Sequence, residues 1–291
     1  MNTQICKPYR KTACFRFPSI LFNEKVAQQA NRFIDRMPKP IPKAPMIEMK
    51  MNGVKVTIFK PKTKPNGILL YFHGGAFLCK AAPYLYEIIE QYCLQANCVV
   101  VFVDYALEPF PSPLLDAIQV LDYITERSDL PRGVAGDSAG GCIAAALALY
   151  CRNHNIPLAL QMLIYPVLDR KMRGESFQMK KTPSWNTKAN AKMWARYSKN
   201  GDLGTPSYLS PMEEKNMVNL PKTIIEVEQF DVLKDDGIEY GKWLYDAGVD
   251  VHTYLNKGLY HGFDANLNPY TRQIIARRAK RIKEAFEAYK A

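Results

Sequence analysis

Ser138 stands between glycines in Gly136-Asp137-Ser138-Ala139-Gly140, which matches the pattern GxSxG. A serine hydroxyl in this pattern is exposed on a sharp strand-to-helix turn, and the glycines leave room for that turn. Residues 132–137 predict a strand before the serine, and residues 139–152 predict an Ala/Leu-rich helix after it. The context predicts acyl transfer with Ser138 as nucleophile. The alternative is that Ser138 only caps the helix, which requires no glycine on either side.

A serine nucleophile needs a general base, and the chain has four histidines. In folds with this nucleophile turn, an acid and then a histidine follow the serine along the chain, which excludes His73. His154 follows the far end of the nucleophile helix, and His252 lies inside a predicted strand over 250–255. His261 comes after the C-terminal end of that strand, where catalytic groups of parallel sheets gather. We predict His261 as the base; the alternative is a loop histidine with no catalytic role.

The acid that orients the base is expected just after the preceding predicted strand, residues 223–228. Asp231 is the first carboxylate in the loop that follows, and we predict that it orients His261 and stabilises its imidazolium form. Asp235 is the second candidate. Asp235 and Asp236 fall at the start of the next predicted helix, where carboxylates often cap, and Glu228 lies further back in the strand.

A glycine pair in His73-Gly74-Gly75-Ala76-Phe77 directly follows the predicted strand 67–72. Glycines at this place free backbone N–H groups to point at a developing oxyanion, and the residue after the nucleophile supplies another donor. We therefore predict an oxyanion hole made by the N–H groups of Gly74, Gly75 and Ala139. Taken alone, the glycine pair would indicate only a tight turn.

Strand-like apolar runs alternate with segments of helical periodicity from residue 54 onward. This alternation predicts an α/β fold with a mostly parallel sheet and helices on both faces. The predicted strands cover residues 54–59, 67–72, 99–104, 132–137, 160–165, 223–228 and 250–255. The predicted helices of this core cover residues 83–95, 113–126, 139–152, 236–247 and a final stretch around 272–283.

Two segments fall outside the alternation. A predicted helix over 23–37 and a proline-studded connector ending near residue 45 precede the core, and a stretch from residue 168 is too long for a simple crossover. Its apolar residues either line a binding site or form the segment's own core: Met172, Met179, Trp185, Met193 and Trp194. We predict an N-terminal cap segment (1–45), a core in two parts (46–167 and 212–291) and a cap insertion (168–211).

The 291 residues are enough for one large α/β domain, and the net charge of +11 raises nucleic acid, anionic membranes and acidic substrates as partners. No nucleic-acid motif is present, and the basic final helix has an apolar face, as a packed helix with a solvated outer face would. No apolar run reaches the ~20 residues of a membrane span. Seven cysteines, no CxxC pair and no export signal predict a cytoplasmic chain with reduced thiols.

Four motifs in the order expected of one family resemble the bacterial hormone-sensitive-lipase-like esterases and lipases of the α/β-hydrolase superfamily. They are HGGA at 73–76, GDSAGG at 136–141, EQFDVLKDDGIEY at 228–240 and HGF at 261–263. The resemblance covers roughly residues 50 to 290. It implies an α/β-hydrolase fold with an eight-stranded sheet and a helical cap, and a carboxylesterase for short- to medium-chain acyl esters. It also implies a small-molecule ester substrate and no cofactor or metal.

The chain departs from this family in two places. Ala76 stands where the family usually has a third glycine, although alanine still offers its N–H. Residues 105–111 lack the arginine that the family carries before its Pro-Phe-Pro stretch. An amide hydrolase on the same fold remains an alternative, since acyl transfer to water uses the same groups. A non-catalytic small-molecule-binding module is a second alternative. The physiological substrate and the oligomeric state, a homodimer included, stay open.

Overall fold

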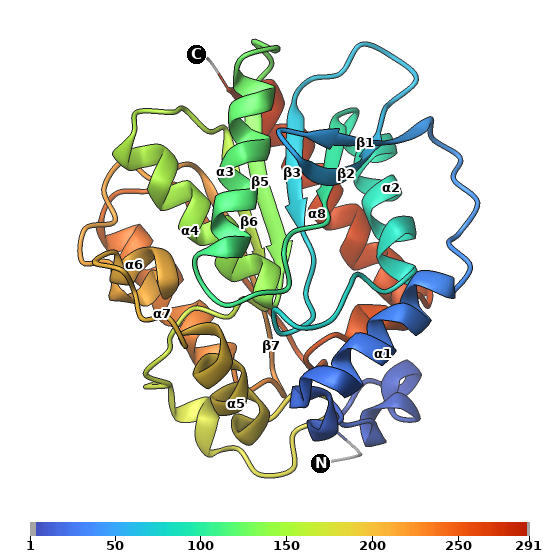
Figure 1. Cartoon of the computed structure of the whole chain (residues 1–291), viewed down its shortest axis with the longest axis vertical. Coiled ribbons are helices and arrows are strands. Elements are labelled where there is room, and N and C mark those ends of the chain that lie inside the picture. Colours follow the sequence, from blue (N-terminus) through green and yellow to red (C-terminus); the bar gives the residue numbers. More distant parts are fainter. Residues whose placement is uncertain (1–3, 290–291) are drawn as a thin grey trace.

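Eight strands form one sheet in the order β1-β2-β4-β3-β5-β6-β7-β8, in a computed structural model that describes residues 4–289 (Figure 1). Strands β3 to β8 run parallel to one another, and β1 and β2 pair antiparallel at one edge. The strands are β1 (Met46–Met51), β2 (Val54–Phe59), β3 (Ile68–Phe72), β4 (Val99–Val103), β5 (Arg132–Asp137), β6 (Leu160–Ile164), β7 (Thr223–Glu228) and β8 (Val251–Asn256). The predicted mostly parallel α/β architecture is confirmed.

Strand β1 was not among the strands predicted from the sequence. This edge strand reads Met-Ile-Glu-Met-Lys-Met, so it offers little of the β-branched and aromatic character that marks a strand, and Glu48 and Lys50 are exposed. Asn52 and Gly53 join β1 to β2 with φ values of 44° and 92°. An Asn-Gly pair with both φ values positive is the usual two-residue hairpin turn, and it was the available signal for β1.

Helices cover both faces of the sheet, as predicted. One hydrophobic core joins α3, α4 and α7 to one face, and a second joins α2 and α8 to the other (Figure 1). The α-helices are α1 (Glu24–Arg36), α2 (Tyr84–Ala96), α3 (Ser112–Thr125), α4 (Ala139–Asn153), α5 (Thr187–Tyr197), α6 (Pro206–Leu209), α7 (Lys234–Asp246) and α8 (Pro269–Ala288). None of the helices within residues 4–289 is long and apolar enough to cross a membrane.

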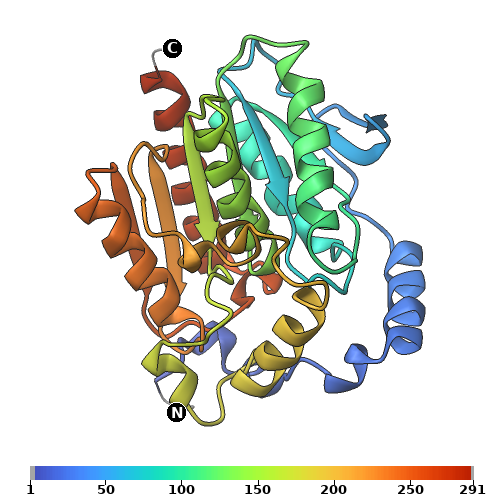
Figure 2. The same cartoon turned by 60° about the vertical axis from the view of Figure 1, so that its left-hand side comes forward.

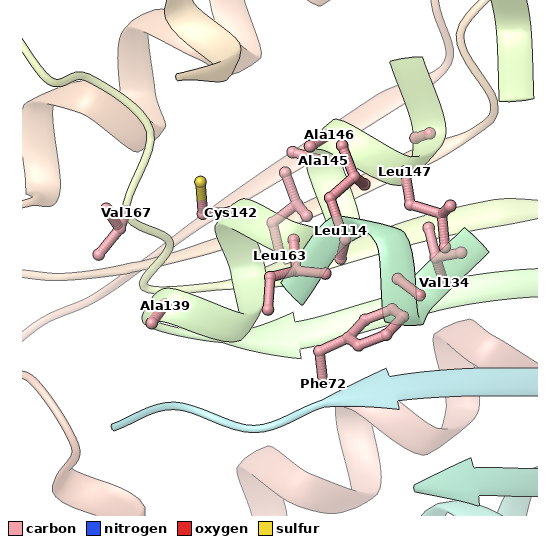
Figure 3. Close-up of a cluster of buried hydrophobic side chains, with 14 of the residues drawn as sticks. Phe72, Leu114, Val134, Ala139, Cys142, Ala145, Ala146, Leu147, Leu163 and Val167 are labelled. Atoms are coloured by element: carbon pink, nitrogen blue, oxygen red, sulfur yellow. The ribbon is translucent and has the colours of Figure 1, made fainter. Parts of the chain in front are cut away.

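Helix α4 packs on the middle of the sheet, where small side chains let it come close. Phe72, Val134 and Leu163 face it from β3, β5 and β6 (Figure 3). A Cβ at Gly140 would lie 2.7 Å from the His73 carbonyl oxygen and closer still to the carbonyl of Phe72. Because the helix approaches β3 this closely, its first turn is fixed beside the carboxyl end of that strand.

The N-terminal segment meets the long insertion at the carboxyl ends of the parallel strands (Figure 2). The N–H of Phe17 donates to the Ser184 carbonyl at 2.9 Å, and the N–H of Ser184 donates to the Phe15 carbonyl at 2.9 Å. The Phe17 ring also packs edge-on against Trp185, with centroids 5.0 Å apart. Two segments far apart in sequence are thereby joined. Of the predicted domain segments, residues 1–3 and 290–291 lie outside the described residues.

Candidate active site

Ser138 lies on the turn between β5, which ends at Asp137, and α4, which begins at Ala139. Its φ of 54° and ψ of −118° are rare for a residue with a side chain, as expected for a strained nucleophile turn. It is the N-cap residue of α4, yet its side chain caps no backbone group. Its Oγ instead lies 2.8 Å from His261 Nε2. The hydroxyl therefore has a hydrogen-bond partner that a simple helix cap would not need.

His261 joins Ser138 to Asp231. The His261 Nδ1–H donates to Asp231 Oδ2 at 2.7 Å, and the other carboxylate oxygen accepts from the N–H of Leu233 at 3.0 Å. Asp231 follows β7 and His261 follows β8, so both loops leave the carboxyl edge of the sheet. The side chains of His261 and Asp231 are 8% and 1% exposed. This line of three groups can move a proton from a hydroxyl to an imidazole beside a buried carboxylate.

The other histidines lie elsewhere. His154 ends α4 and its Nδ1 lies 2.8 Å from the Tyr150 carbonyl oxygen. His252 lies within β8, 3.7 Å from Asp250. His73 is fully buried, stacks on Tyr105 and donates from Nδ1 to the Gly74 carbonyl at 2.6 Å. Burial lowers the His73 pKa, which keeps this ring neutral behind the glycine loop.

The other candidate acids have different surroundings. Asp235 accepts from the Ser176 N–H at 2.6 Å and pairs with Lys234. Glu228 accepts from Asn256 at 3.1 Å, and burial, with the neighbouring Glu226, raises its pKa well above the ordinary value. Burial, with Asp169 nearby, raises the pKa of Asp236 to about 8.

Two aromatic rings flank His261. The Tyr165 ring packs edge-on against the imidazole with centroids 4.8 Å apart, and the Trp185 ring lies 5.9 Å away on the insertion. Tyr165 follows β6 directly and donates to Asp264 at 2.6 Å. From the sequence, Trp185 was predicted only as one of the insertion's apolar residues, and Tyr165 was not predicted at the site. Tyr165 falls at the carboxyl end of a predicted strand, and this position was the signal that could have indicated it.

A buried arginine lies beneath the His261 loop. Arg278 of α8 pairs with Glu226 of β7 and, at 2.9 Å, with Asp264 three residues after His261. Burial opposes ionisation of Glu226, but Arg278 and Arg277 lower its pKa overall. Removing one partner of a buried ion pair leaves an unpaired buried charge and lowers the stability of the folded protein. The pairing ties the loop that carries His261 to both α8 and the sheet.

The glycine loop after β3 turns sharply beside the serine. Gly75 has a φ of 127°, which only glycine adopts readily, and Ala76 follows with a φ of 59°. The Gly74 amide faces the buried carboxylate of Asp137. Burial, with Asp264, raises the Asp137 pKa to about 7, although the Tyr71 hydroxyl and the Gly74 amide oppose this rise. Within residues 4–289, no hydrogen bond is recorded for the N–H groups of Gly75, Ala76 and Ala139.

Helix α5 of the insertion holds this loop from outside. Arg196 donates to the Phe77 carbonyl at 2.9 Å and to the Leu107 carbonyl at 2.7 Å. The next residue, Tyr197, stacks on the Phe77 ring with centroids 3.7 Å apart. Leu107 belongs to the stretch that departs from the family's sequence by lacking an arginine. An arginine from the insertion therefore joins that stretch to the glycine loop.

The described residues contain no group of three or more His, Cys, Asp and Glu side chains placed to hold a metal ion. The hydrogen-bonded line from Ser138 to Asp231 lies buried at the carboxyl edge of the sheet. Beside it lie the N–H groups of Gly75, Ala76 and Ala139, which bond to no other group within the described part of the chain. A nucleophile, a base, an acid and donors for a developing negative charge are the components that acyl transfer requires.

Comparisons with known proteins show the family and the fold of the chain. The family Abhydrolase_3, described as an alpha/beta hydrolase fold, matches residues 69–265. Esterase LipI of Mycobacterium tuberculosis is 32% identical over 260 residues, covering 82% of this chain and 81% of that protein. An arylesterase of Saccharolobus solfataricus is 26% identical, with 96% of each chain covered.

Solved structures of esterases are similar to this chain in fold. The crystal structure of esterase LipW from Mycobacterium marinum superposes with a TM-score of 0.86 at 26% identity, covering 98% of this chain and 97% of that one. An esterase from the bacterial hormone-sensitive lipase family superposes with a TM-score of 0.81 at 23% identity over 96% of each chain, a likeness of fold alone.

Proposed function

The chain belongs to the Abhydrolase_3 family of the alpha/beta hydrolase fold and is a serine hydrolase that acts on ester bonds, and we propose that Ser138, His261 and Asp231 are its catalytic triad. The observation that carries the proposal is the unbroken hydrogen-bonded line from Ser138 Oγ through His261 to Asp231. The proposed reaction is hydrolysis of short- to medium-chain acyl esters through an acyl-enzyme.

In the first step, His261 Nε2 takes the proton of the Ser138 hydroxyl while Oγ attacks the ester carbonyl carbon. Asp231 holds the tautomer that carries its proton on Nδ1, which leaves the Nε2 lone pair facing the serine at 2.8 Å. The imidazolium that forms is stabilised by the buried carboxylate. It then gives the proton to the departing alkoxide, and an alcohol leaves the acyl-enzyme.

The negative charge on the carbonyl oxygen requires hydrogen-bond donors. Of the three predicted donors, we keep the N–H groups of Gly75 and Ala139, which have no recorded protein partner. The Gly74 amide faces the Asp137 carboxylate, and we therefore assign the third donor to its neighbour Ala76. Asp137 would then hold the glycine loop in place without touching the substrate.

In the second step, water attacks the acyl-enzyme. His261 removes the proton from that water, and the same N–H donors stabilise the second oxyanion. Collapse breaks the bond between the acyl carbon and Ser138 Oγ, and His261 returns the proton to the serine. The products are a carboxylic acid and the free enzyme, so the cycle needs no cofactor.

We further propose that residues 1–45 and 168–211 act as a cap over this site. Phe17 of the first segment packs on Trp185 of the second, and Trp185 lies against His261. Ser138 is only 8% exposed under this cover, so a substrate would reach the hydroxyl past the Phe17 and Trp185 side chains. We propose that these apolar side chains favour the short- to medium-chain acyl groups of the proposed substrates.

The test is a series of p-nitrophenyl esters of increasing acyl length, run on the wild type and on Ser138→Ala. We expect kcat/KM to peak at a short or medium chain and to fall at least ~10³-fold in Ser138→Ala. Matched ester and amide analogues distinguish esterase from amidase. No release of p-nitrophenol by the wild type, or full activity of Ser138→Ala, would contradict the proposal.

A further inference from the structure

The positive charge of the molecule is concentrated at its N-terminal segment. Residues 1–45 carry nine lysines and arginines against only Glu24 and Asp35, so they hold seven of the eleven net positive charges. Several of these cations are exposed and, within the described residues, have no recorded ion pair: Lys7, Lys11, Lys25, Arg32, Arg36 and Lys43. Within residues 4–289, these six cations therefore face solvent without an ion pair, whereas Lys39 of the same segment pairs with Glu48.

The same segment exposes large apolar side chains. Ile41 is 93% exposed, Phe33 67% and Ile20 63%, and Phe15 and Met37 are also exposed. Thirteen large apolar residues are exposed in the whole described chain, and five of them fall in this segment. Scattered exposed apolar residues need no explanation, but their concentration among cations marks an interaction surface.

Helix α1 has one side that contacts the rest of the molecule and another that is exposed to solvent. It contacts the body through buried Ala27 and through Asn31, whose amide donates to the Leu78 carbonyl at 2.9 Å. Phe33 is six residues after Ala27 and therefore lies well around the helix from it, on the exposed side, and Met37 follows directly after the last helical residue. Lys25, Arg32 and Arg36 follow helical spacing on the adjoining polar side.

Exposed apolar side chains next to a row of basic side chains are the pattern of a segment that lies in the interface of a membrane, and here Phe33 is on the helix while Met37 and Ile41 follow it. We propose that residues 15–43 form a docking surface for an anionic lipid bilayer, with Phe33 and Ile41 entering the acyl boundary and the cations contacting headgroups. Helix α1 stands at the periphery of the molecule, joined to it by extended connectors (Figure 2). This position leaves the surface free to meet a flat partner.

Charge favours lipid over a second copy of the chain. Two copies meeting through this surface would bring two strongly positive segments together, whereas a bilayer containing anionic lipid is complementary. Exposed Ile41 and Phe33 favour lipid over a nucleic acid, because binding to phosphates alone requires no apolar anchors. The surface is part of the N-terminal cap segment, and the backbones of Phe15 and Phe17 in that segment pair with Ser184 of the insertion. If the proposed function holds, docking would bring the site to esters dissolved in the membrane.

The experiment is co-sedimentation of the full chain with vesicles of phosphatidylcholine alone or mixed with phosphatidylglycerol. We expect binding to the mixed vesicles and little to the neutral ones, weakened by added salt. The triple variant Lys25→Gln/Arg32→Gln/Arg36→Gln should bind about 100-fold more weakly, since each basic residue near such a surface contributes about fivefold. Phe33→Gln/Ile41→Gln should lose at least about tenfold.

The matched control is Lys60→Gln/Lys62→Gln/Lys64→Gln, which removes three exposed lysines from the loop that leads from β2 to the amino end of β3, opposite the carboxyl ends at which the cap segments meet. It should bind vesicles like the wild type. Equal loss in this control, equal binding to neutral vesicles, or no binding would overturn the proposal. So would self-association through Phe33, or binding of a DNA duplex that depends on the cations but not on Phe33 and Ile41.

A second readout separates this proposal from the proposed function. The control Lys60→Gln/Lys62→Gln/Lys64→Gln should hydrolyse a water-soluble short-chain ester like the wild type, and Ser138→Ala should bind vesicles like the wild type. A chain that binds anionic vesicles but hydrolyses no ester refutes the triad and keeps the docking surface. A chain that hydrolyses esters but binds no vesicles refutes the docking surface alone.

Discussion

Replacing Asp231 by asparagine should reverse the tautomer of His261. Asp231 Oδ1 accepts from the Leu233 N–H at 3.0 Å, and Oδ2 accepts from His261 Nδ1 at 2.7 Å. In Asp231→Asn, the Leu233 N–H holds the amide oxygen, so the amide NH₂ faces Nδ1. The imidazole must then accept at Nδ1 and carry its proton on Nε2. Nε2 lies 2.8 Å from Ser138 Oγ, and in that tautomer it cannot accept the hydroxyl proton.

This loss has a definite size. A wrong tautomer in a Ser-His-Asp triad lowers kcat about 10⁴-fold, which corresponds to about 5.4 kcal/mol of transition-state stabilisation. The assay is kcat for p-nitrophenyl butyrate at saturation, measured from acidic to alkaline pH. Circular dichroism and urea unfolding check that the variant remains folded.

Asp235→Asn is the matched control, since Asp235 was the second candidate for the acid. Its carboxylate binds the Ser176 N–H and Lys234 and has no recorded bond to the imidazole. Partly exposed pairs of this kind contribute little, so kcat should change by about threefold or less. A fall of less than about tenfold in Asp231→Asn, or a larger fall in Asp235→Asn, would refute the assignment of the acid.

Three further variants test the supporting structure. Gly140→Ala places a Cβ against the carbonyls at the end of β3. A resulting shift of ~1 Å in Ser138 or in the glycine loop should lower kcat about 100-fold, and wild-type activity would contradict the close approach of α4 to β3. Arg196→Met removes both hydrogen bonds from α5 to the loops beside the site, so kcat should fall roughly 10- to 100-fold with little change in the free energy of unfolding. A large fall in the free energy of unfolding with unchanged kcat would show that the arginine has only a structural role. The folded pKa of Asp236 is raised to about 8, so the native state binds the extra proton and wild-type stability falls as pH rises from ~4 to ~8. Asp236→Asn should lack this fall and exceed the wild type by about 6 kcal/mol in unfolding free energy above pH ~8, since each pKa unit corresponds to about 1.4 kcal/mol. A pH-independent difference in urea denaturation would refute this cause.

Much of the fold follows from periodicity in the sequence. The central parallel strands are buried, so β3 to β7 could be placed within a residue or two. The edge strand β8 was placed as closely, although it is only partly buried. The edge strand β1 could not, because half of its residues face solvent and its Met-rich sequence has no strong strand preference. Its turn, Asn52-Gly53, carried more information than the strand did.

Part of the candidate site could likewise be predicted from the sequence, and part could not. Chain order and strand ends singled out Ser138, His261 and Asp231, because these positions are local to elements that periodicity predicts. The contacts of Gly74 with Asp137 and of Arg196 with two loops depend on tertiary distances that no spacing encodes. The sequence could therefore name the candidate reacting groups, while the groups that hold them in place required the three-dimensional structure.

The most direct test of the central claim is covalent labelling with diethyl p-nitrophenyl phosphate, followed by mass spectrometry of the whole chain and its peptides. A triad activates one serine, so the reagent should add a single diethylphosphoryl group to Ser138, with loss of esterase activity in proportion. Ser138→Ala should remain unlabelled. A wild-type chain that keeps its activity after treatment, or that is labelled at another residue with Ser138 unmodified, would contradict the assignment of Ser138 as the nucleophile.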